Sequence, residues 1–121
     1  RRSYVDPALV RYAVDLVAAT REPARCGLGD LTRLLTFGAS PRATIGLIEG
    51  ARALAFLRGR DYVLPEDVVD LAPDVLRHRL VLSYEALSEG LSADALVAQI
   101  MAVVPVPDKP LESHVRVAAP L

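Results

Sequence analysis

The sequence predicts an all-α fold, a small bundle of four to five helices with at most one short pair of strands. Apolar residues recur with the 3.6-residue period of a helix in several segments, and Pro or a capping residue stands before most of these segments. The chain has 121 residues, of which 52% are hydrophobic. This is enough to bury one core and too little for a multidomain enzyme.

The first predicted helix begins after Asp6, whose carboxylate can accept backbone N–H bonds, and Pro7 suits the first helical position because it has no N–H group to lose. The helix should run to about Thr20, since an apolar stripe is formed by Leu9, Ala13, Leu16 and Val17. Residues 21–38 are less regular, and we expect a loop with one or two helical turns in which Asp30 could cap a short helix.

The longest predicted helix starts at Ser40-Pro41 and runs to Arg58, with Gly59 in the position that commonly ends a helix. Its apolar period is carried by Leu47, Ile48, Ala51, Leu54 and Ala55. Two glycines inside this helix each cost roughly 1 kcal/mol of helix propensity. We therefore expect another backbone to approach closely at these two positions, Gly46 and Gly50.

The second half of the chain contains further helical segments. After a short extended link over residues 61–64, a helix begins at Pro65, and Pro73 is expected to start a separate short helix. Residues 80–84 fit either the last turn of that helix or an extended segment. The side chains expected to contribute to the core here are Val68, Val69, Leu71, Val75, Leu76 and Leu80.

The last predicted helix is capped by Ser92 and keeps helical spacing through Leu96, Val97, Ile100, Met101 and Val104. Beyond this point four prolines interrupt a stretch without any sustained period. We therefore divide the chain into a helical domain over residues 1–104 and a Pro-rich C-terminal arm or tail over residues 105–121.

Composition limits the classes of partner. Lys and Arg number 14 against 15 Asp and Glu, giving a net charge of -1, so no excess positive field attracts nucleic acid or an anionic membrane. Cys26 is the only cysteine, which excludes an internal disulfide and a Cys-rich zinc site and fits a cytoplasmic protein. No apolar stretch reaches the ~20 residues of a membrane span. Because the chain begins without Met, we expect a piece of a longer protein.

Most signatures of catalysis are missing. The sequence has no phosphate-binding loop, no paired histidines on a helix and no nucleophile elbow. His78 and His114 lack a Cys or His companion, so no metal site is predicted, and His78 is expected at a helix end. The basic clusters at residues 58–60 and 77–79 could grip phosphates, but solvated turns or a protein interface suit them better because no aromatic residue suited to base stacking accompanies them.

Residues 38–42, Gly-Ala-Ser-Pro-Arg, are the strongest candidate site. A helix N-terminus presents unpaired N–H groups and partial positive charge, and Arg42 adds a guanidinium in the first turn. Phosphate groups bind well at such a place. The alternative is that Ser40 and Pro41 merely start the helix and that Arg42 is solvated.

Four segments in order carry a resemblance to a known family. They read Gly-Ala-Ser-Pro-Arg-Ala (38–43), Ala-Arg-Ala-Leu-Ala-Phe-Leu-Arg-Gly-Arg-Asp-Tyr-Val (51–63), Pro-Glu-Asp-Val (65–68) and Leu-Ala-Pro-Asp-Val-Leu-Arg-His-Arg-Leu (71–80), followed by Leu-Ser-Tyr-Glu (82–85). This pattern resembles the C-terminal lid of MoxR-family AAA+ ATPases and covers roughly residues 5–107. By resemblance, Arg42 is the sensor 2 arginine, which reaches the γ-phosphate of ATP, and Ser40 and Pro41 belong to the same ATP-binding segment.

The resemblance implies an ATPase that uses ATP and Mg²⁺ and is built from this lid and a preceding α/β domain. It further implies a hexameric ring and a chaperone-like role in protein complex maturation or cofactor insertion, often beside a von Willebrand factor A domain partner. The phosphate loop and the magnesium ligands would lie in the preceding domain, so the isolated chain is expected to be inactive. Two departures are the longer segment over residues 21–38 and Leu64, which stands where such lids often have a capping Thr.

Alternative functions stay open at this level. The same lid could belong to a related motor such as a chelatase subunit, which the sequence of the preceding domain would reveal. The chain could instead be a helical interaction or DNA-binding module, and salt-sensitive binding to DNA would favour that function. A free-standing catalytic bundle is disfavoured because no set of acid, base and nucleophile is apparent.

Overall fold

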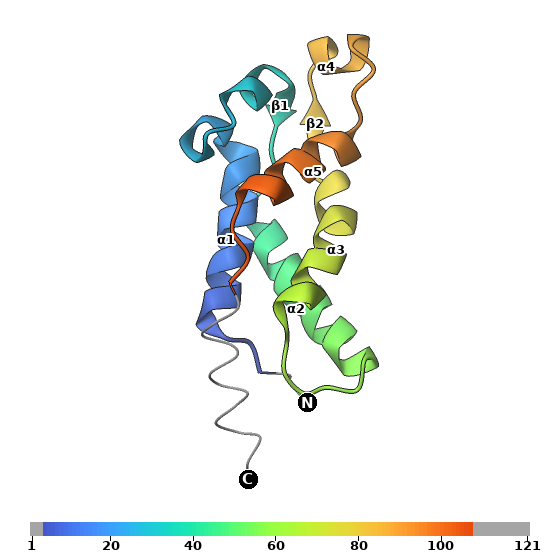
Figure 1. The fold of residues 1–121 in the computed structure, drawn as a ribbon. Helices are drawn as coiled ribbons and strands as arrows, with labels where there is room; N and C mark the ends of the chain where they lie inside the picture. Colours follow the sequence, from blue (N-terminus) through green and yellow to red (C-terminus); the bar gives the residue numbers. More distant parts are fainter. Residues whose placement is uncertain (1–3, 108–121) are drawn as a thin grey trace.

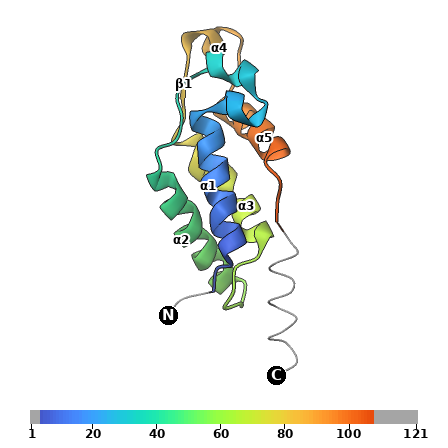
Figure 2. The ribbon, with the colours of Figure 1, turned by 90° about the vertical axis from the view of Figure 1, so that its left-hand side faces the viewer.

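The computed structural model describes residues 4–107, and it confirms an all-α bundle with one very small antiparallel sheet (Figure 1). The helices α1, α2 and α3 lie side by side, and α5 packs across the upper parts of α1 and α3, below a tip formed by β1, β2 and α4 (Figure 1 and Figure 2). The elements in chain order are α1 (Pro7–Arg21), the 3-10 helices η1 (Pro23–Cys26) and η2 (Gly29–Arg33), β1 (Leu35–Phe37), α2 (Arg42–Leu57), α3 (Pro65–Arg77), β2 (Val81–Leu82), α4 (Tyr84–Ser88) and α5 (Ala93–Val103).

Helix α1 begins as the sequence predicts. An Asp6 carboxylate oxygen accepts the backbone N–H of Ala8 at 2.8 Å, and Pro7 occupies the first turn. The apolar stripe of α1 is buried in the core together with Tyr12. The prediction of helical turns over residues 21–38 is also confirmed by η1 and η2. Capping by Asp30 was wrong, because Asp30 already lies inside η2, whose first turn is closed by the Leu28 carbonyl accepting Leu31 N–H.

A tight contact between backbones joins the end of α1 to the segment that precedes α2. A Cβ atom at Gly38 would overlap the carbonyl oxygen of Thr20, so the position accepts only glycine without a shift of backbone. The buried Thr20 hydroxyl donates to the Val17 carbonyl at 2.7 Å and accepts the Ala39 N–H at 2.9 Å. These contacts fix the entry of α2 against α1.

Helix α2 ends at Leu57, with Gly59 in the left-handed conformation at φ 81°, as predicted. The expectation of close backbone approach at its two glycines was wrong. A Cβ atom at Gly50 would overlap the Leu71 Cδ2 atom, which belongs to a side chain, and one at Gly46 would make only ordinary contacts near 3.9 Å. Since α3 packs along α2, small residues here leave room for side chains of α3.

Helix α3 is continuous from Pro65 to Arg77, so the predicted restart at Pro73 was wrong. Proline removes one backbone hydrogen bond inside the helix. The helix nevertheless continues, because Val68, Ala72 and Leu76 recur at a spacing of four and bury one continuous stripe in the core. Val69 and Leu71 are partly buried against the same core. His78 follows as the exposed C-cap residue, at the helix end predicted for it.

Residues 81–82 form a strand, which resolves the ambiguity left by the sequence. Strand β2 pairs antiparallel with β1, with Leu35 opposite Leu82 and Phe37 opposite Val81. Ser83 then accepts the Ala86 N–H on its hydroxyl and starts α4, a short helix that the sequence analysis did not identify. These elements form the tip in Figure 1.

Ser92 caps α5 as predicted, its hydroxyl accepting the Ala95 N–H at 3.2 Å. Helix α5 buries Leu96, Val97 and Ile100. Residues 105–107 follow along α1, and the rest of the predicted arm, residues 108–121, lies outside the described residues. Within residues 4–107, no helix combines the length and apolar character that crossing a bilayer requires.

The described chain begins with a single bridge between two segments far apart in sequence. Tyr4 donates its N–H to the Asp61 carbonyl at 2.9 Å and accepts the Val63 N–H at 2.8 Å, which forms a parallel bridge to Tyr62. The start of the chain is thereby joined to the loop between α2 and α3.

Candidate functional site

The predicted site lies between β1 and α2. Ala39 is buried and held by the Thr20 hydroxyl, whereas Ser40, Pro41 and Arg42 are exposed. The Ser40 hydroxyl accepts the Arg42 N–H at 3.3 Å, and the Ser40 and Pro41 carbonyls accept the next two amides of the helix. The first N–H groups of α2 are therefore already hydrogen-bonded within the chain. Any anion bound here would rely on the Arg42 side chain.

The Arg42 guanidinium is open to the outside of the bundle. Arg42 is exposed, and no carboxylate of the described residues lies within 4.0 Å of its side-chain nitrogens. A guanidinium is permanently charged and offers five N–H donors in a fork that matches phosphate geometry. The geometry leaves this group available to an anion supplied by another molecule or domain.

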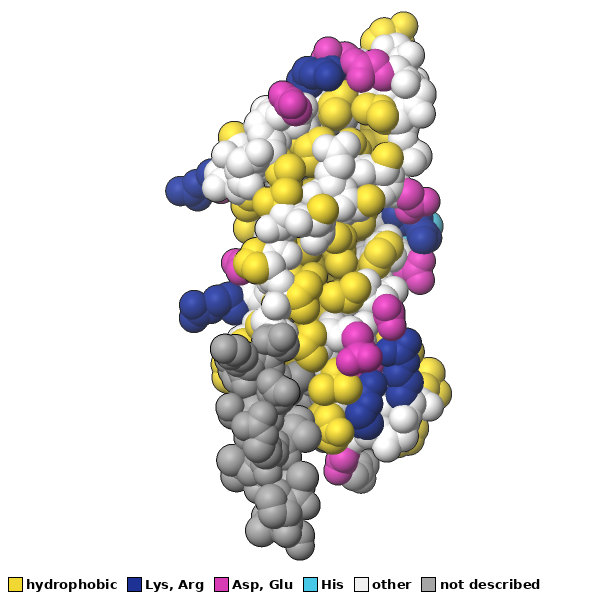
Figure 3. Space-filling view, viewed as in Figure 1, with side chains coloured by type: hydrophobic (Ala, Val, Ile, Leu, Met, Phe, Trp, Pro, Cys, Tyr) yellow, Lys and Arg dark blue, Asp and Glu magenta, His cyan; other side chains and the backbone are white. Residues whose placement is uncertain are grey.

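Near the opposite end of α2, the first turn of α3 carries a buried carboxylate with several hydrogen-bond partners. Asp67 is fully buried and accepts hydrogen bonds from Arg58 at 2.9 Å, from Arg60 at 2.7 and 2.8 Å, and from the Leu64 N–H at 2.8 Å. Burial alone would raise the pKa of Asp67, but the hydrogen bonds and charges of the arginines and the Leu64 amide hold that pKa below its usual value. Figure 3 shows basic and acidic side chains side by side at this end of the molecule.

Residues 58 and 59 form an exposed turn, as expected, but both arginines of this cluster also bind Asp67, which was not predicted. Asp67 could have indicated in the sequence that these arginines have a partner. It stands at the third position of α3, from which a carboxylate reaches back to the amide before the helix. Leu64 gives the helix no side-chain cap, as expected, and Asp67 supplies this reciprocal half of a capping box.

The three residues of the second basic cluster, 77–79, have different surroundings. Arg77 binds Asp74 within α3 and Asp94 of α5, and its Nε–H donates to the Asp94 carboxylate at 2.9 Å. His78 is exposed at the helix end. Arg79 is exposed and has no carboxylate of the described residues within 4.0 Å. Only Arg77 of this cluster serves to join two helices.

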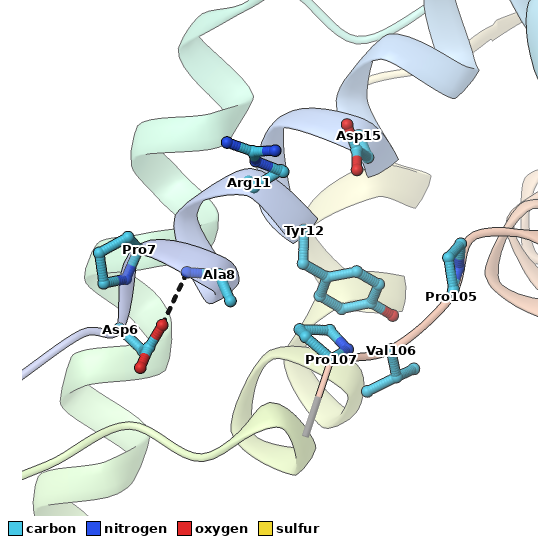
Figure 4. Close-up of a pocket in the computed structure, with 9 residues that line it drawn as sticks. All are labelled: Asp6, Pro7, Ala8, Arg11, Tyr12, Asp15, Pro105, Val106 and Pro107. Atoms are coloured by element: carbon cyan, nitrogen blue, oxygen red, sulfur yellow. Dashed lines mark hydrogen bonds between the residues drawn. The ribbon is translucent and has the colours of Figure 1, made fainter. Parts of the chain in front are cut away.

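A pocket of about 470 Å³, which the sequence did not predict, lies between the start of α1 and the segment after α5 (Figure 4). Tyr12 lies in it, and its buried hydroxyl has no hydrogen-bond partner among the described residues. Burial raises the pKa of this hydroxyl. The sequence could not predict the pocket because residues 105–107 show no periodicity that would place them along α1. Its lining residues are Asp6, Pro7, Ala8, Arg11, Tyr12, Asp15, Pro105, Val106 and Pro107.

No group of three or more His, Cys, Asp or Glu side chains in residues 4–107 is arranged to hold a metal ion.

The pocket at Tyr12 is separate from the segment with Arg42. The pocket lies along the first turns of α1, whereas the segment with Arg42 contacts the last turn of α1 at Thr20. Around Arg42, the described residues offer an exposed guanidinium that could bind an anion.

Comparison with known families decides the assignment. Residues 32–100 match the AAA lid domain. The chain belongs to the AAA lid domain family. Among the relatives of this lid, Chaperone MoxR1 of Mycobacterium tuberculosis is 49% identical over 105 residues, which is 87% of this chain and 28% of that protein. Protein MoxR of Paracoccus denitrificans is 43% identical over 111 residues, 87% of this chain and 32% of that protein.

A solved structure agrees with the fold of the lid. The crystal structure of "a putative ATPase" from Cytophaga hutchinsonii superposes with a TM-score of 0.85 at 41% identity, covering 88% of this chain and 32% of that one. These relatives confirm the resemblance to the lid of MoxR-family ATPases. The lid spans about a third or less of the length of each of these proteins.

Proposed function

We propose that this chain is the lid that completes the ATP site of a MoxR-like AAA+ ATPase, with Arg42 as the sensor 2 arginine. The observation that carries the proposal is the exposed Arg42 guanidinium, which has no carboxylate partner within residues 4–107 although it stands at the rigid start of the longest helix. Ser40 and Pro41 shape this start and bring the arginine to the nucleotide. The similarity to MoxR proteins and to a solved ATPase supports a nucleotide as the anion.

The proposed action follows from electrostatics. A guanidinium beside the γ-phosphate stabilises the charge that develops during phosphoryl transfer, and its contact is lost when that phosphate leaves. Hydrogen bonds to Thr20 before α2 and to Asp67 after it tie both ends of the helix to the rest of the bundle. Loss of the phosphate contact would therefore move the lid as a body.

The rest of the ATPase would supply what the lid lacks. On the similarity to MoxR proteins, we assign the Mg²⁺ ligands and the phosphate loop to a preceding α/β domain. We further propose assembly into a hexameric ring in the cytoplasm, a chaperone-like role in complex maturation or cofactor insertion, and a von Willebrand factor A domain protein as partner. The isolated lid is expected to have no ATPase activity.

The test is ATP turnover by the full-length protein carrying Arg42→Ala. We expect turnover to fall at least about tenfold, because one donor to the transferring phosphoryl group is lost. Arg11→Ala is the matched control, since Arg11 is also exposed and lacks a carboxylate partner in the described structure but lies at the far end of α1. Turnover equal to wild type in Arg42→Ala, with both variants folded, would refute the sensor assignment.

A chelatase motor is the second candidate, and one observation favours it. The Magnesium-chelatase subunit ChlI of Nicotiana tabacum is 54% identical over 39 residues, although the match covers only 32% of this chain and 9% of that protein. The proteins named MoxR match far more of the lid. Restored magnesium chelation on adding the full-length protein to a chelatase that lacks its ChlI subunit would establish the second candidate.

A further inference from the structure

We propose that Arg79 is a second nucleotide-binding arginine of the lid, which contacts the phosphates of the same ATP molecule as Arg42. The inference rests on the proposed function and extends it to a residue of a different helix end. Arg79 lies just after α3, 37 positions along the chain from Arg42, so only the fold brings the two arginines to one region.

The hairpin of α2 and α3 places Arg79 beside the first turns of α2. The two helices pack along each other in opposite directions, so that Gly50 faces Leu71 and Gly46 faces Val75. The Arg79 Nη2 atom is 3.9 Å from the place that a Cβ atom would take at Gly46. Gly46 is one turn beyond Arg42 and on nearly the same face of α2, a rise of about 6 Å along the helix axis.

The small sheet leads to the same region independently. Phe37 pairs with Val81 in the antiparallel register. The pairing ends at Phe37 and Val81, and in an antiparallel pair the residues before Val81 approach from the same end as those after Phe37 leave. Arg79 is two residues before Val81, and Ala39 is two residues after Phe37, so Arg79 reaches the level of the segment that leads into Arg42.

The charges at this place are unbalanced. Arg42 and Arg79 are both exposed, and within residues 4–107 neither has a carboxylate inside ion-pair distance. Arg77, two residues away, is held by both Asp74 and Asp94. Two like charges on adjacent elements repel each other weakly. They are satisfied together by one anion with several charged oxygens, such as a triphosphate.

The two arginines should differ in their effects on the reaction. Arg42 belongs to the first turn of α2, where the resemblance assigns contact with the phosphoryl group that is transferred. Arg79 lies beside the second turn and is assigned to the phosphates that stay bound. Its interaction should be equal before and during the chemical step, so that its loss weakens binding and raises KM while kcat changes little.

The experiment compares Arg79→Ala, Arg79→Lys, Arg42→Ala and Arg11→Ala in the full-length protein, with ATP and Mg²⁺ as the ligands. For Arg79→Ala we expect the KM for ATP to rise about fivefold to tenfold with kcat within twofold of wild type. The KM should also depend less steeply on salt, because one charge fewer attracts the nucleotide. Arg79→Lys should recover part of the loss since it keeps the charge, and Arg11→Ala should match wild type.

Each outcome decides between the proposals. A normal KM and salt dependence in Arg79→Ala, with reduced turnover in Arg42→Ala, would overturn this inference and leave the proposed function standing. Normal kinetics in both variants would overturn both. A rise in KM for Arg79→Ala that accompanies a loss of thermal stability and leaves the salt dependence of KM unchanged would make the residue structural and would also overturn the inference.

Discussion

The two ends of α2 carry arginines in opposite circumstances. After the helix, Arg58 and Arg60 bind the fully buried Asp67, and Arg58 also binds Asp70. At its start, Arg42 is exposed and has no carboxylate partner in the described structure. Where the lid uses arginine to hold its own fold, the charge is neutralised inside the chain. For Arg42, whose charge is not neutralised by a described residue, we expect the counter-charge to come from another molecule or domain.

Removing the buried carboxylate should have the largest effect on stability. Asp67→Ala leaves Arg58 and Arg60 without their common partner and removes the acceptor of the Leu64 amide. We expect the free energy of unfolding to fall by about 3 kcal/mol, the lower end of what breaking a buried ion pair costs, because both arginines can still reach water. Urea denaturation measures the change.

Arg42→Ala is the matched variant at the other end of the helix and should change the free energy of unfolding by no more than about 0.5 kcal/mol. Equal losses of stability in the two variants would contradict the division between a structural and an outward-facing end.

The next effect concerns the joint between α1 and α2. In Gly38→Ala the new methyl group must displace the Thr20 carbonyl, which is backbone and cannot rotate away. A cost of about 2 kcal/mol in the free energy of unfolding is expected. Gly29→Ala, where a Cβ atom meets nothing within 4 Å, is the control. Crystal structures or thermal melts in which the two variants behave alike would show that the joint yields.

Acid should lower the free energy of unfolding through protonation of Asp67, the buried carboxylate that binds Arg58 and Arg60. The pKa of Asp67 in the folded chain is lower than its ordinary value of 3.8, so its ionised form stabilises the fold. That contribution is complete above about pH 5 and is lost as the pH falls below 3.8 toward the folded pKa. Stability measured by denaturation at a series of pH values should therefore decrease over this range, and Asp67→Asn should flatten the decrease. An unchanged slope in Asp67→Asn would assign the acid sensitivity to other groups.

The smallest effect distinguishes the two glycines inside α2. Gly46→Ala adds a methyl group with only ordinary contacts and should raise stability by up to about 1 kcal/mol through helix propensity. In Gly50→Ala the same gain is offset because Leu71 must move its Cδ2 atom. Thermal melts of the two variants side by side measure the difference, and a larger gain at Gly50 would reverse the expected order.

The parts of the fold that local chemistry determines could be predicted from the sequence. Caps at Asp6 and Ser92 and a left-handed glycine at Gly59 each act within a few residues, and they mark helix ends correctly. Arg42 could be identified as the candidate because a family pattern surrounds it, and the structure places it on the surface.

Apart from the misplaced cap at Asp30, the main errors depend on contacts between distant segments. Pro73 reads as a break by local rules, but packing of one continuous apolar face carries α3 through it. The pairing of Arg60 with Asp67 and the contact of Gly38 with Thr20 require the positions of two elements at once. The pocket at Tyr12 needs the path of residues 105–107, which sequence periodicity does not describe.

The bridge between Tyr4 and Tyr62 marks a point about which the lid could turn. It clamps the start of the described chain to the loop after α2, at the end of the helix remote from Arg42. The 16 residues of α2 span about 24 Å. A swing of about 10° around that clamp would therefore carry the arginine roughly 4 Å, the difference between touching a phosphate and losing it.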